Sequence, residues 1–375
     1  MRRQPALDAL RGIFLVMMTL THLPVPLGRA VGQPLGFVSA AEGFVLLSAF
    51  LLGLIYGARL AQDGYRSVAR ALRRRALKLY LCQLGLLMLA FTCIAPAGRE
   101  LGIAAISNLF GYQGAHPLLA AVGGALLVHA PPLLDILPMY AVFVALSPVV
   151  LRHAQTRGWR GLLCASAALW LLAQLGLKTF LHKWFVTTTG LPFPFSATGS
   201  FDIFGWQLLW MLGLYLGSRR ARGVRDTLPA DSVVWRLCLV LTLYFFAWRH
   251  TVGIFPFGHD GSALNVLADK WTLGPLRLAN FLVLTALLWR WGPMLAPFFT
   301  RGPLVQLGRQ ALPVFCTQTV LSLIALALIG DEQEQLSWRA QAVIVSFCLV
   351  VLYGVARAAE LLSERRRMRT AVPAA

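Results

Sequence analysis

The stretch GFVSAAEGFVLLSAFLLGLIYG, residues 36–57, contains one charged side chain, Glu42, in an otherwise apolar run. A helix of about 20 apolar residues is long enough to cross the ~30 Å hydrocarbon core of a bilayer. Because that core offers no partners to free backbone groups, a run of this kind has to be helical there. We therefore predict a transmembrane helix over residues 36–58.

The whole chain shares this apolar character. Of its 375 residues, 58% are hydrophobic and 13% are charged, and the mean hydropathy is +0.67. These values lie outside the usual range of soluble domains. They predict an all-α polytopic membrane protein that forms one transmembrane domain over residues 1–375, without a separate soluble domain.

Scanning for apolar runs of spanning length predicts a bundle of about ten transmembrane helices. The predicted spans are 8–27, 36–58, 77–95, 133–151, 162–181, 202–218, 234–251, 274–291, 310–329 and 339–358. Arg and Lys crowd alternate loops, which is the positive-inside pattern. It places both termini in the cytoplasm and predicts a basic cytoplasmic tail at 359–375. Residues 115–132 are apolar enough to hold an extra or re-entrant helix.

The formal net charge of +19 would suggest nucleic acid as the partner of a soluble protein. Here the basic residues lie in short clusters between apolar runs, so we expect the lipid bilayer as their partner and no nucleic acid. The six cysteines show no C-x-x-C pair and no ligand-like spacing, which favours small core residues over metal ligands. We expect no metal site and no permanently bound cofactor. No pattern indicates an oligomeric state.

Three polar groups interrupt the first span, ALDALRGIFLVMMTLTHLPVP, residues 6–26: Asp8, Arg11 and His22. At 100° per residue, the eleven-residue step from Arg11 to His22 closes almost three turns, so the two side chains share one face, ~16 Å apart along the axis. A titratable group inside a membrane is costly and by default marks a functional site. The spacing places the charged Asp8 and Arg11 at the cytoplasmic end of the first span and the His22 imidazole near its outer end.

Glu42 lies about six residues from the outer end of the second span, at a depth like that of His22. A carboxylate beside an imidazole orients one tautomer and raises the basicity of the ring, as a general base requires. We therefore predict that His22 and Glu42 are catalytic. The alternative is that the two groups only satisfy one another in the core of the bundle.

The segment RSVARALRRRALKLY, residues 66–80, is the densest positive cluster in the chain. Its period is helical and it runs directly into the third span, so some guanidinium groups should face the bundle and others the lipid phosphates. Arginine is suited to bidentate phosphate contacts. A phosphate-bearing donor that enters from the cytoplasm would meet this cluster and Arg11, although topology alone also explains the cluster.

Other polar groups lie near the outer ends of later spans. Trp206 and Gln207, together with Asp202, begin the sixth span, where aromatic side chains are ordinarily interface anchors and could also stack a sugar. His259 and Asp260 lie in a loop predicted to be periplasmic, where they are either solvated or in contact with substrate.

The sequence resembles the OpgC family of bacterial membrane proteins and, more distantly, the acyltransferase-3 group. The resemblance is carried in family order by LDALRG and His22, GFVSAAEGFVLLSAFLLGLIYG (36–57), LPMYAVFVALSPVVL (137–151), FGWQLLWMLGLYLG (204–217) and LGRQALPVFCTQTVLS (307–322). The spacing of Arg11 and His22 is shared with the wider group, in which this histidine is regarded as catalytic. A second basic motif is similar to RRRALKLY and maps to Arg74, Arg75 and Lys78. Ala49 departs from the family, which usually has Ser-Gly at 48–49.

The resemblance implies transfer of an acyl group, succinyl or acetyl, from cytoplasmic acyl-CoA to hydroxyls of a periplasmic glucan or another extracytoplasmic saccharide. It also implies an enzyme of the bacterial inner membrane, with acyl-CoA as the donor substrate. The residues expected to bind donor or acceptor are Arg11, Asp8, Arg74, Arg75, Lys78, Trp206 and Gln207.

Two other classes of function fit the same residues. A transporter or flippase for a saccharide or its lipid-linked precursor would also place charged groups in a central cavity, although the sequence shows neither an inverted repeat nor matched broken helices. A non-catalytic membrane partner in polysaccharide assembly is the third possibility. Binding of acyl-CoA separates the enzyme from the transporter.

Overall fold

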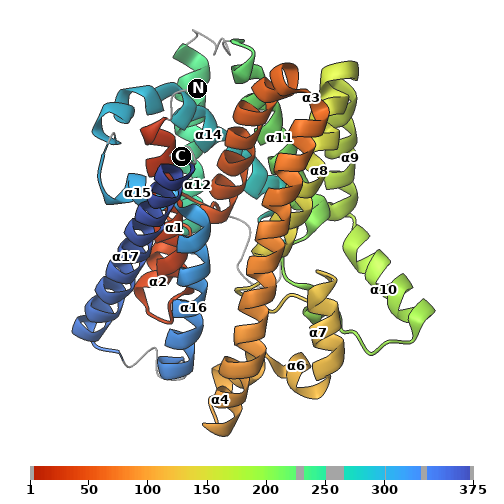
Figure 1. Ribbon diagram of the computed structural model, residues 1–375, viewed down its shortest axis with the longest axis vertical. Coiled ribbons are helices and arrows are strands. Elements are labelled where there is room, and N and C mark those ends of the chain that lie inside the picture. The colour runs from red at the N-terminus through yellow and green to blue at the C-terminus, as the bar shows by residue number, and fades with distance from the viewer. Residues whose placement is uncertain (1–3, 225–231, 251–265, 300, 331–335, 372–375) are drawn as a thin grey trace.

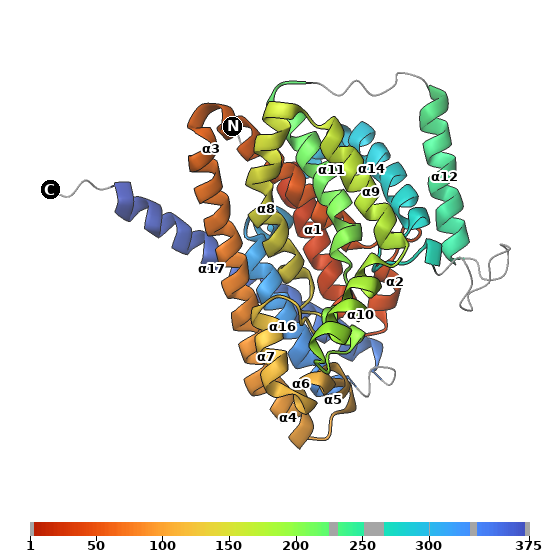
Figure 2. The same cartoon turned by 90° about the vertical axis from the view of Figure 1, so that its right-hand side faces the viewer.

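The computed structural model describes residues 4–224, 232–250, 266–299, 301–330 and 336–371. Within these ranges the regular secondary structure is all helical, with loops between the helices and no β-strand, so the all-α prediction is confirmed for the described residues. Most of the long helices run along the long axis of the molecule in one elongated bundle, with α1 (Pro5–His22) in its interior (Figures 1 and 2).

The long helices form the frame of the bundle. After α1 they are α3 (Ala40–Leu89), α8 (Ile136–Arg157), α9 (Arg160–Gln174), α10 (Leu177–Thr189), α11 (Ile203–Ala221), α12 (Ser232–His250), α14 (Pro275–Leu295), α16 (Ala311–Ile329) and α17 (Trp338–Ala371). Shorter pieces connect them: α2 (Leu27–Gly32), α4 (Ala95–Glu100), α5 (Ala104–Leu109), α6 (Gly111–Ala115), α7 (Pro117–Ala125) and α15 (Pro303–Arg309), with a π-helical turn at Ala90–Ile94 and 3-10 turns at Phe195–Thr198 and Ala296–Phe299.

Six helical stretches of the described chain are long and apolar enough to cross a membrane, or up to seven if the bent pair α9 and α10 forms one span. The six are Ala40–Glu100, Ile136–Arg157, Val233–His250, Pro275–Phe299, Ala311–Ile329 and Trp338–Arg365. They make this a multi-pass membrane protein. Each of the ten predicted spans overlaps a helix. Because α1 and α11 are not among the six candidates, ten crossings and cytoplasmic termini stay predictions.

Helix α3 contains two of the predicted spans and reverses direction between them. At Gly64 the backbone leaves the helical region, with φ 75° and ψ 166°. Glycine reaches this positive φ without the steric cost that a side chain imposes. Figure 1 shows α3 rising to this bend and then descending along its second half. The basic segment 66–80 is therefore part of the descending half and continues into the third predicted span.

Several boundaries differ from the predicted ones for local reasons. Helix α1 ends at His22 rather than at residue 27, because the backbone becomes extended at Leu23 and two prolines follow. The span predicted over 162–181 is broken near Gly176, which has φ 87°, and its two halves meet at 68°. The apolar segment 115–132 forms only the nine-residue α7, which is too short to cross the bilayer. The predicted basic tail begins as a continuation of α17.

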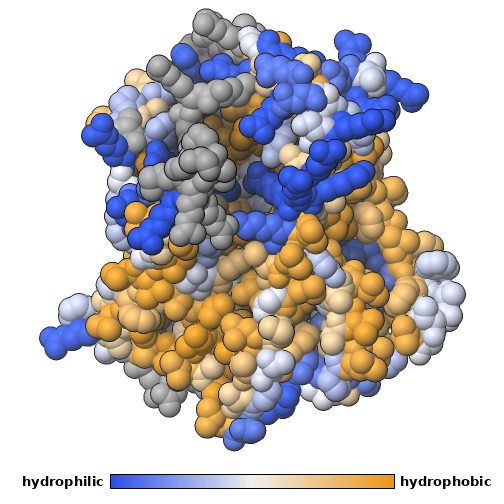
Figure 3. Space-filling model, viewed as in Figure 1, coloured by the Kyte–Doolittle hydropathy of each residue, from blue (hydrophilic) through white to orange (hydrophobic). Residues whose placement is uncertain are grey.

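The surface divides into a hydrophilic part and an apolar part. Figure 3 shows hydrophilic residues gathered over the end of the molecule where α3 bends, and a broad apolar surface below them. This distribution is typical of a protein with one end in the aqueous phase and a belt in lipid. The prediction that the cysteines are core residues holds for the buried Cys348, whereas Cys93 and Cys164 are exposed.

Small residues allow α3 and α11 to pack closely. A Cβ atom added to Gly53 would lie 2.5 Å from the carbonyl oxygen of Leu214, and one added to Gly217 would collide with the carbonyl oxygen of Phe50. Close approach of backbones at small residues is a common way for helices to associate in membranes. Ala49 belongs to this contact, because it is fully buried against Gly213. The departure from Ser-Gly at 48–49 thus lies in a helix–helix contact.

We expect Gly217→Ala to lower the free energy of unfolding by about 1–3 kcal/mol, because the new methyl group meets backbone atoms that cannot rotate away. Gly85→Ala is the matched control, since nothing lies within 4 Å of a Cβ atom added there, and it should stabilise the helix by about 0.5–1 kcal/mol. Thermal unfolding of both variants in lipid nanodiscs measures the difference. Equal stability of the two variants would contradict the packing described here.

Candidate functional site

Arg11 lies on α1 and lines an internal cavity of about 80 Å³. The other walls come from α3, α8, α11 and α16, and include the aromatic residues Phe44, Tyr140, Trp210 and Phe315. The guanidinium carbon of Arg11 lies 5.8 Å from the centre of the Phe44 ring. An arginine is therefore held against an aromatic wall in the interior of the bundle.

Three polar atoms of this cavity lack hydrogen-bond partners among the described residues. They are Arg11 Nε, Ser48 Oγ and Tyr140 Oη, and all three are buried. A buried polar atom without a partner is costly, so it is usually satisfied by a ligand or an ordered water. The cavity thus presents a cation and two hydroxyl groups to a polar ligand group.

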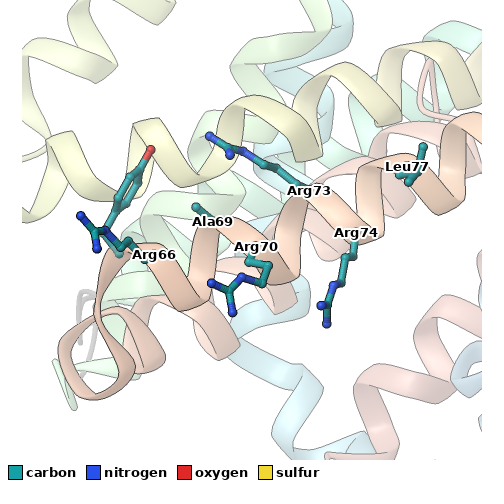
Figure 4. A pocket seen from close by; sticks show the side chains of 7 residues that line it. Arg66, Ala69, Arg70, Arg73, Arg74 and Leu77 are labelled. Carbon is teal, nitrogen blue, oxygen red and sulfur yellow. The ribbon is translucent and has the colours of Figure 1, made fainter.

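The descending half of α3 contributes basic residues to two different surfaces. Arg75 and Lys78 line the same cavity as Arg11, and both side chains are exposed at its edge. Arg74 instead lines an outer groove of about 420 Å³, together with Tyr65, Arg66, Ala69, Arg70, Arg73 and Leu77. Figure 4 shows Arg70 and Arg74 extending from one side of the helix and Arg73 from the opposite side. Of the three predicted basic residues, the structure brings two into the internal cavity.

Asp8 lies one turn before Arg11, and its carboxylate contacts a different arginine. Asp8 Oδ2 is 3.6 Å from Arg309 Nε, at the end of α15. Arg309 also reaches Glu360 of α17, with 3.7 Å between Nη1 and Oε1. Asp8 therefore connects the first helix to two late elements of the chain, while its charge also acts on Arg11.

Glu42 is fully buried in the first turn of α3, and both of its oxygens are engaged. Oε2 accepts hydrogen bonds from the backbone N–H and the hydroxyl of Ser39, at 3.0 and 2.7 Å. Oε1 forms an ion pair of 2.7 Å with Nη1 of Arg277, which is only 3% exposed. Ser39 and Glu42 form a capping box, whose S-x-x-E pattern is visible in the sequence.

The predicted contact between Glu42 and His22 is not formed. No hydrogen bond joins the two side chains in the described part of the chain, because Arg277 and Ser39 occupy the carboxylate. His22 ends α1 and is half-buried. The charged group that acts on it is Lys270. Sequence reasoning found Glu42 and missed both Lys270 and Arg277, which lie more than 200 residues away along the chain.

Lys270 lies in the loop 268–274, which precedes α14. Its charge interacts with those of Glu42, Arg277 and Asp135. Burial lowers the pKa of Lys270 below the ordinary lysine value of 10.5, and Glu42 opposes this change by favouring the charged form. Burial likewise raises the pKa of Asp135, which precedes α8 and accepts a hydrogen bond from the N–H of Ser200 at 3.0 Å. Five titratable groups, including His22, thus gather at this end of α1.

Trp206 is fully buried, and it holds the Lys270 loop in place. Its Nε1 donates to the carbonyl oxygens of Lys270 and Trp271, at 3.1 and 3.0 Å. Phe201 packs edge-on against its ring, with 4.8 Å between centroids. With no exposed face, the indole cannot stack a sugar in this arrangement.

Gln207, the next residue, connects α11 to α9. Its Nε2 donates to the carbonyl oxygen of Ser166 at 2.8 Å, and its Oε1 accepts from the Ser166 hydroxyl at 2.7 Å. Asp202 caps α11 by accepting from the N–H of Phe204 at 2.8 Å. These three residues of the sixth predicted span thus shape the scaffold around the site. His259 and Asp260 lie outside the described residues.

Comparison with known proteins gives one match. The family described as OpgC protein matches residues 3–364 of this chain, which is nearly its whole length. No curated protein and no solved structure matches it.

Proposed function

Because the chain belongs to the OpgC family, we propose that it is a membrane acyltransferase. In this proposal, it transfers an acyl group, succinyl or acetyl, from cytoplasmic acyl-CoA to a hydroxyl of a periplasmic glucan or another extracytoplasmic saccharide. The protein would lie in the bacterial inner membrane and cross it ten times, with both termini in the cytoplasm. Family membership supports the transferase class, and the geometry of α1 supports the route through the bundle.

The observation that carries the proposal is the arrangement along one face of α1. Arg11 opens into a cavity with unpartnered polar groups and two further basic residues, Arg75 and Lys78. His22 lies eleven residues further on the same face, about 16 Å along the axis. This arrangement suits an extended donor that carries phosphates at one end and a thioester at the other. Its phosphates would lie near the arginines and its thioester near the imidazole.

The outer groove adds a second phosphate-binding surface on the same helix. Arg70 and Arg74 extend from one side of α3 (Figure 4), and Ala69 and Leu77 line the same groove. Guanidinium groups bind phosphate in bidentate geometry, so two neighbouring surfaces suit a nucleotide that carries phosphates at more than one position. We propose that the nucleotide of the donor lies across Arg74, Arg75 and Lys78, and that Asp8 acts on Arg11 in the same cavity as Arg75 and Lys78.

The reaction needs a base for the acceptor hydroxyl, and His22 is the proposed one. The hydroxyl oxygen attacks the thioester carbonyl carbon while the imidazole takes its proton, so that a C–O bond forms and the carbonyl oxygen becomes negatively charged. When this oxyanion collapses, the C–S bond breaks and the thiolate of CoA receives the proton from the imidazolium. Glu42 would act on this centre through Arg277 and the loop rather than by direct contact.

We expect Arg75→Gln to weaken binding of CoA about 10-fold or more, because a charge-assisted hydrogen bond contributes about 1.5–3 kcal/mol. Isothermal titration of the full chain in nanodiscs with CoA measures this change. Arg59→Gln is the matched control, since Arg59 is an exposed arginine of α3 that lines neither cavity. Absence of CoA binding by the wild-type protein would favour a saccharide transporter, because such a protein has no use for this nucleotide.

A further inference from the structure

We propose that the ammonium group of Lys270 binds the oxyanion that forms on the donor carbonyl when the acceptor hydroxyl attacks beside His22. This inference rests on the proposed acyl transfer and adds to it a catalytic residue on the loop between α12 and α14. Four features of the loop and its surroundings support it: its rigid attachment, an ammonium group without an acceptor among the described residues, the neighbouring charges and the electrostatic interaction with His22.

The loop is fixed through its backbone carbonyl groups. Trp206 donates to the carbonyl oxygens of Lys270 and Trp271, Gln174 donates to that of Thr272 at 2.9 Å, and Trp170 donates to that of Leu273 at 2.9 Å. Arg277 Nε binds the carbonyl oxygen of Ala268 at 3.0 Å. Side chains of three helices therefore hold the loop, so the position of Lys270 is set in advance of substrate binding. Preorganised charges of this kind stabilise a transition state without reorganisation.

The ammonium group has no direct acceptor in the part of the chain that the structure describes. Lys270 Nζ makes no hydrogen bond or ion pair there, and it lies instead over two aromatic rings, 4.9 Å from the Trp271 centroid and 5.8 Å from that of Phe201. Lys178, a half-buried lysine of α10, differs because its Nζ donates to the carbonyl oxygen of Gly199 at 2.6 Å. Among the described residues, no group therefore accepts a hydrogen bond from Lys270 Nζ.

The charges that face Lys270 come from four elements. They are His22 of α1, Glu42 of α3, Arg277 of α14 and Asp135 before α8. Glu42 is already paired with Arg277, and Asp135 is bonded to Ser200. The charge of Lys270 interacts with the His22 ring, and a proton that moves to this ring adds a second positive charge. Once a proton moves to the ring, a nearby oxyanion balances both cations.

In the proposed step Lys270 loses no proton. The acceptor oxygen forms its bond to the carbonyl carbon, the π electrons of the carbonyl move to its oxygen, and the ammonium donates a hydrogen bond to that oxygen. His22 holds the hydroxyl proton. Collapse of the oxyanion then breaks the C–S bond, and the leaving thiolate takes the proton from His22.

The test compares Lys270→Met, Lys270→Arg and the control Lys178→Met as full chains in nanodiscs. The substrates are succinyl-CoA or acetyl-CoA with a glucan oligosaccharide, and release of the CoA thiol is measured. Removing one oxyanion donor typically costs about 10²–10³ in kcat. We expect this loss in Lys270→Met with little change in the KM for acyl-CoA, whereas Lys178→Met should stay within a few-fold of wild type.

The pH profile gives a readout that a structural role would not change. Because the ammonium is the active form, wild-type kcat should fall as pH rises through the lowered pKa of Lys270, that is, below 10.5. Lys270→Arg, which keeps its charge at this pH, should keep the fold and shift this fall to higher pH. If kcat of Lys270→Arg fell at the same high pH as that of wild type, the inference would be overturned. A kcat of Lys270→Met close to that of wild type would also overturn it.

Failure of this inference is distinguishable from failure of the proposed function. If wild-type protein releases no CoA in the presence of acceptor, while it binds neither acyl-CoA nor CoA, both proposals are overturned. If wild-type protein is active, His22→Ala is inactive and Lys270→Met keeps its kcat, only the role of Lys270 is overturned.

Discussion

His22→Ala should lower the rate of acyl transfer by about 10²–10⁴-fold, which is the usual contribution of a positioned general base. Its binding of CoA should stay close to that of wild type, because the proposed phosphate contacts lie near Arg11, about 16 Å away along α1. Activity is measured as CoA release with a glucan acceptor, and binding by titration with CoA.

His153→Ala serves as the matched control for this variant. His153 lies near the last turn of α8, away from the residues that act on His22. We expect this variant to retain activity. If His22→Ala kept wild-type activity, the assignment of the base would be wrong; if it lost CoA binding together with activity, His22 would act in donor binding instead.

Breaking the ion pair between Glu42 and Arg277 should have the largest effect on stability. Both side chains are buried, so either Glu42→Gln or Arg277→Met leaves an unpaired charge in the interior. Loss of one partner of a buried pair typically destabilises a protein by about 3–5 kcal/mol. Thermal unfolding of each variant in nanodiscs, together with the double variant, measures the loss and the coupling.

The double variant, which lacks both charges, measures how strongly Glu42 and Arg277 stabilise one another. With both charges removed no unpaired charge remains, so its stability should exceed that of either single variant. Arg357→Gln is the control, because Arg357 forms an exposed pair with Glu360 at 3.1 Å and should cost less than about 1 kcal/mol. If the losses of the single variants simply added in the double variant, the two residues would not stabilise one another.

The positions of the helices could be predicted because, in lipid, the backbone N–H and C=O groups of each apolar run have to form hydrogen bonds within the run itself. The ends were harder to predict. Gly176 has a positive φ and breaks the fifth predicted span. The sequence showed no sign of this break apart from a glycine within an apolar run. The reversal of α3 occurs at Gly64, between the second and third predicted spans, in an interval that the sequence marked only by its basic residues.

The site was predictable only as far as one helix determines it. The spacing of Arg11 and His22 depends on helix geometry and could be read from the sequence. Whether Arg74 or Arg75 faces the cavity depends on how α3 is rotated against its neighbours, because adjacent residues are 100° apart. Tertiary packing sets that rotation, and it places the exposed Arg75 at the edge of the cavity.

Lys270 and Arg277 could not be found from a local pattern. Arg277 is 235 residues from Glu42 in the sequence, and neither residue belongs to a motif with a known spacing. The signal that could have been used was the S-x-x-E pattern of Ser39 and Glu42. It indicates that one oxygen of Glu42 serves the helix start, which leaves a single oxygen for any further partner.

A structure of the full chain in nanodiscs with CoA or a non-reactive acyl-CoA analogue tests the central claim most directly. We predict that the phosphates lie against Arg75 and Lys78, with the nucleotide toward Arg74, and that the sulfur end extends past Arg11 to His22. The opposite result would be CoA bound outside this cavity, or with its sulfur end directed away from His22, and that placement would contradict acyl transfer at this site.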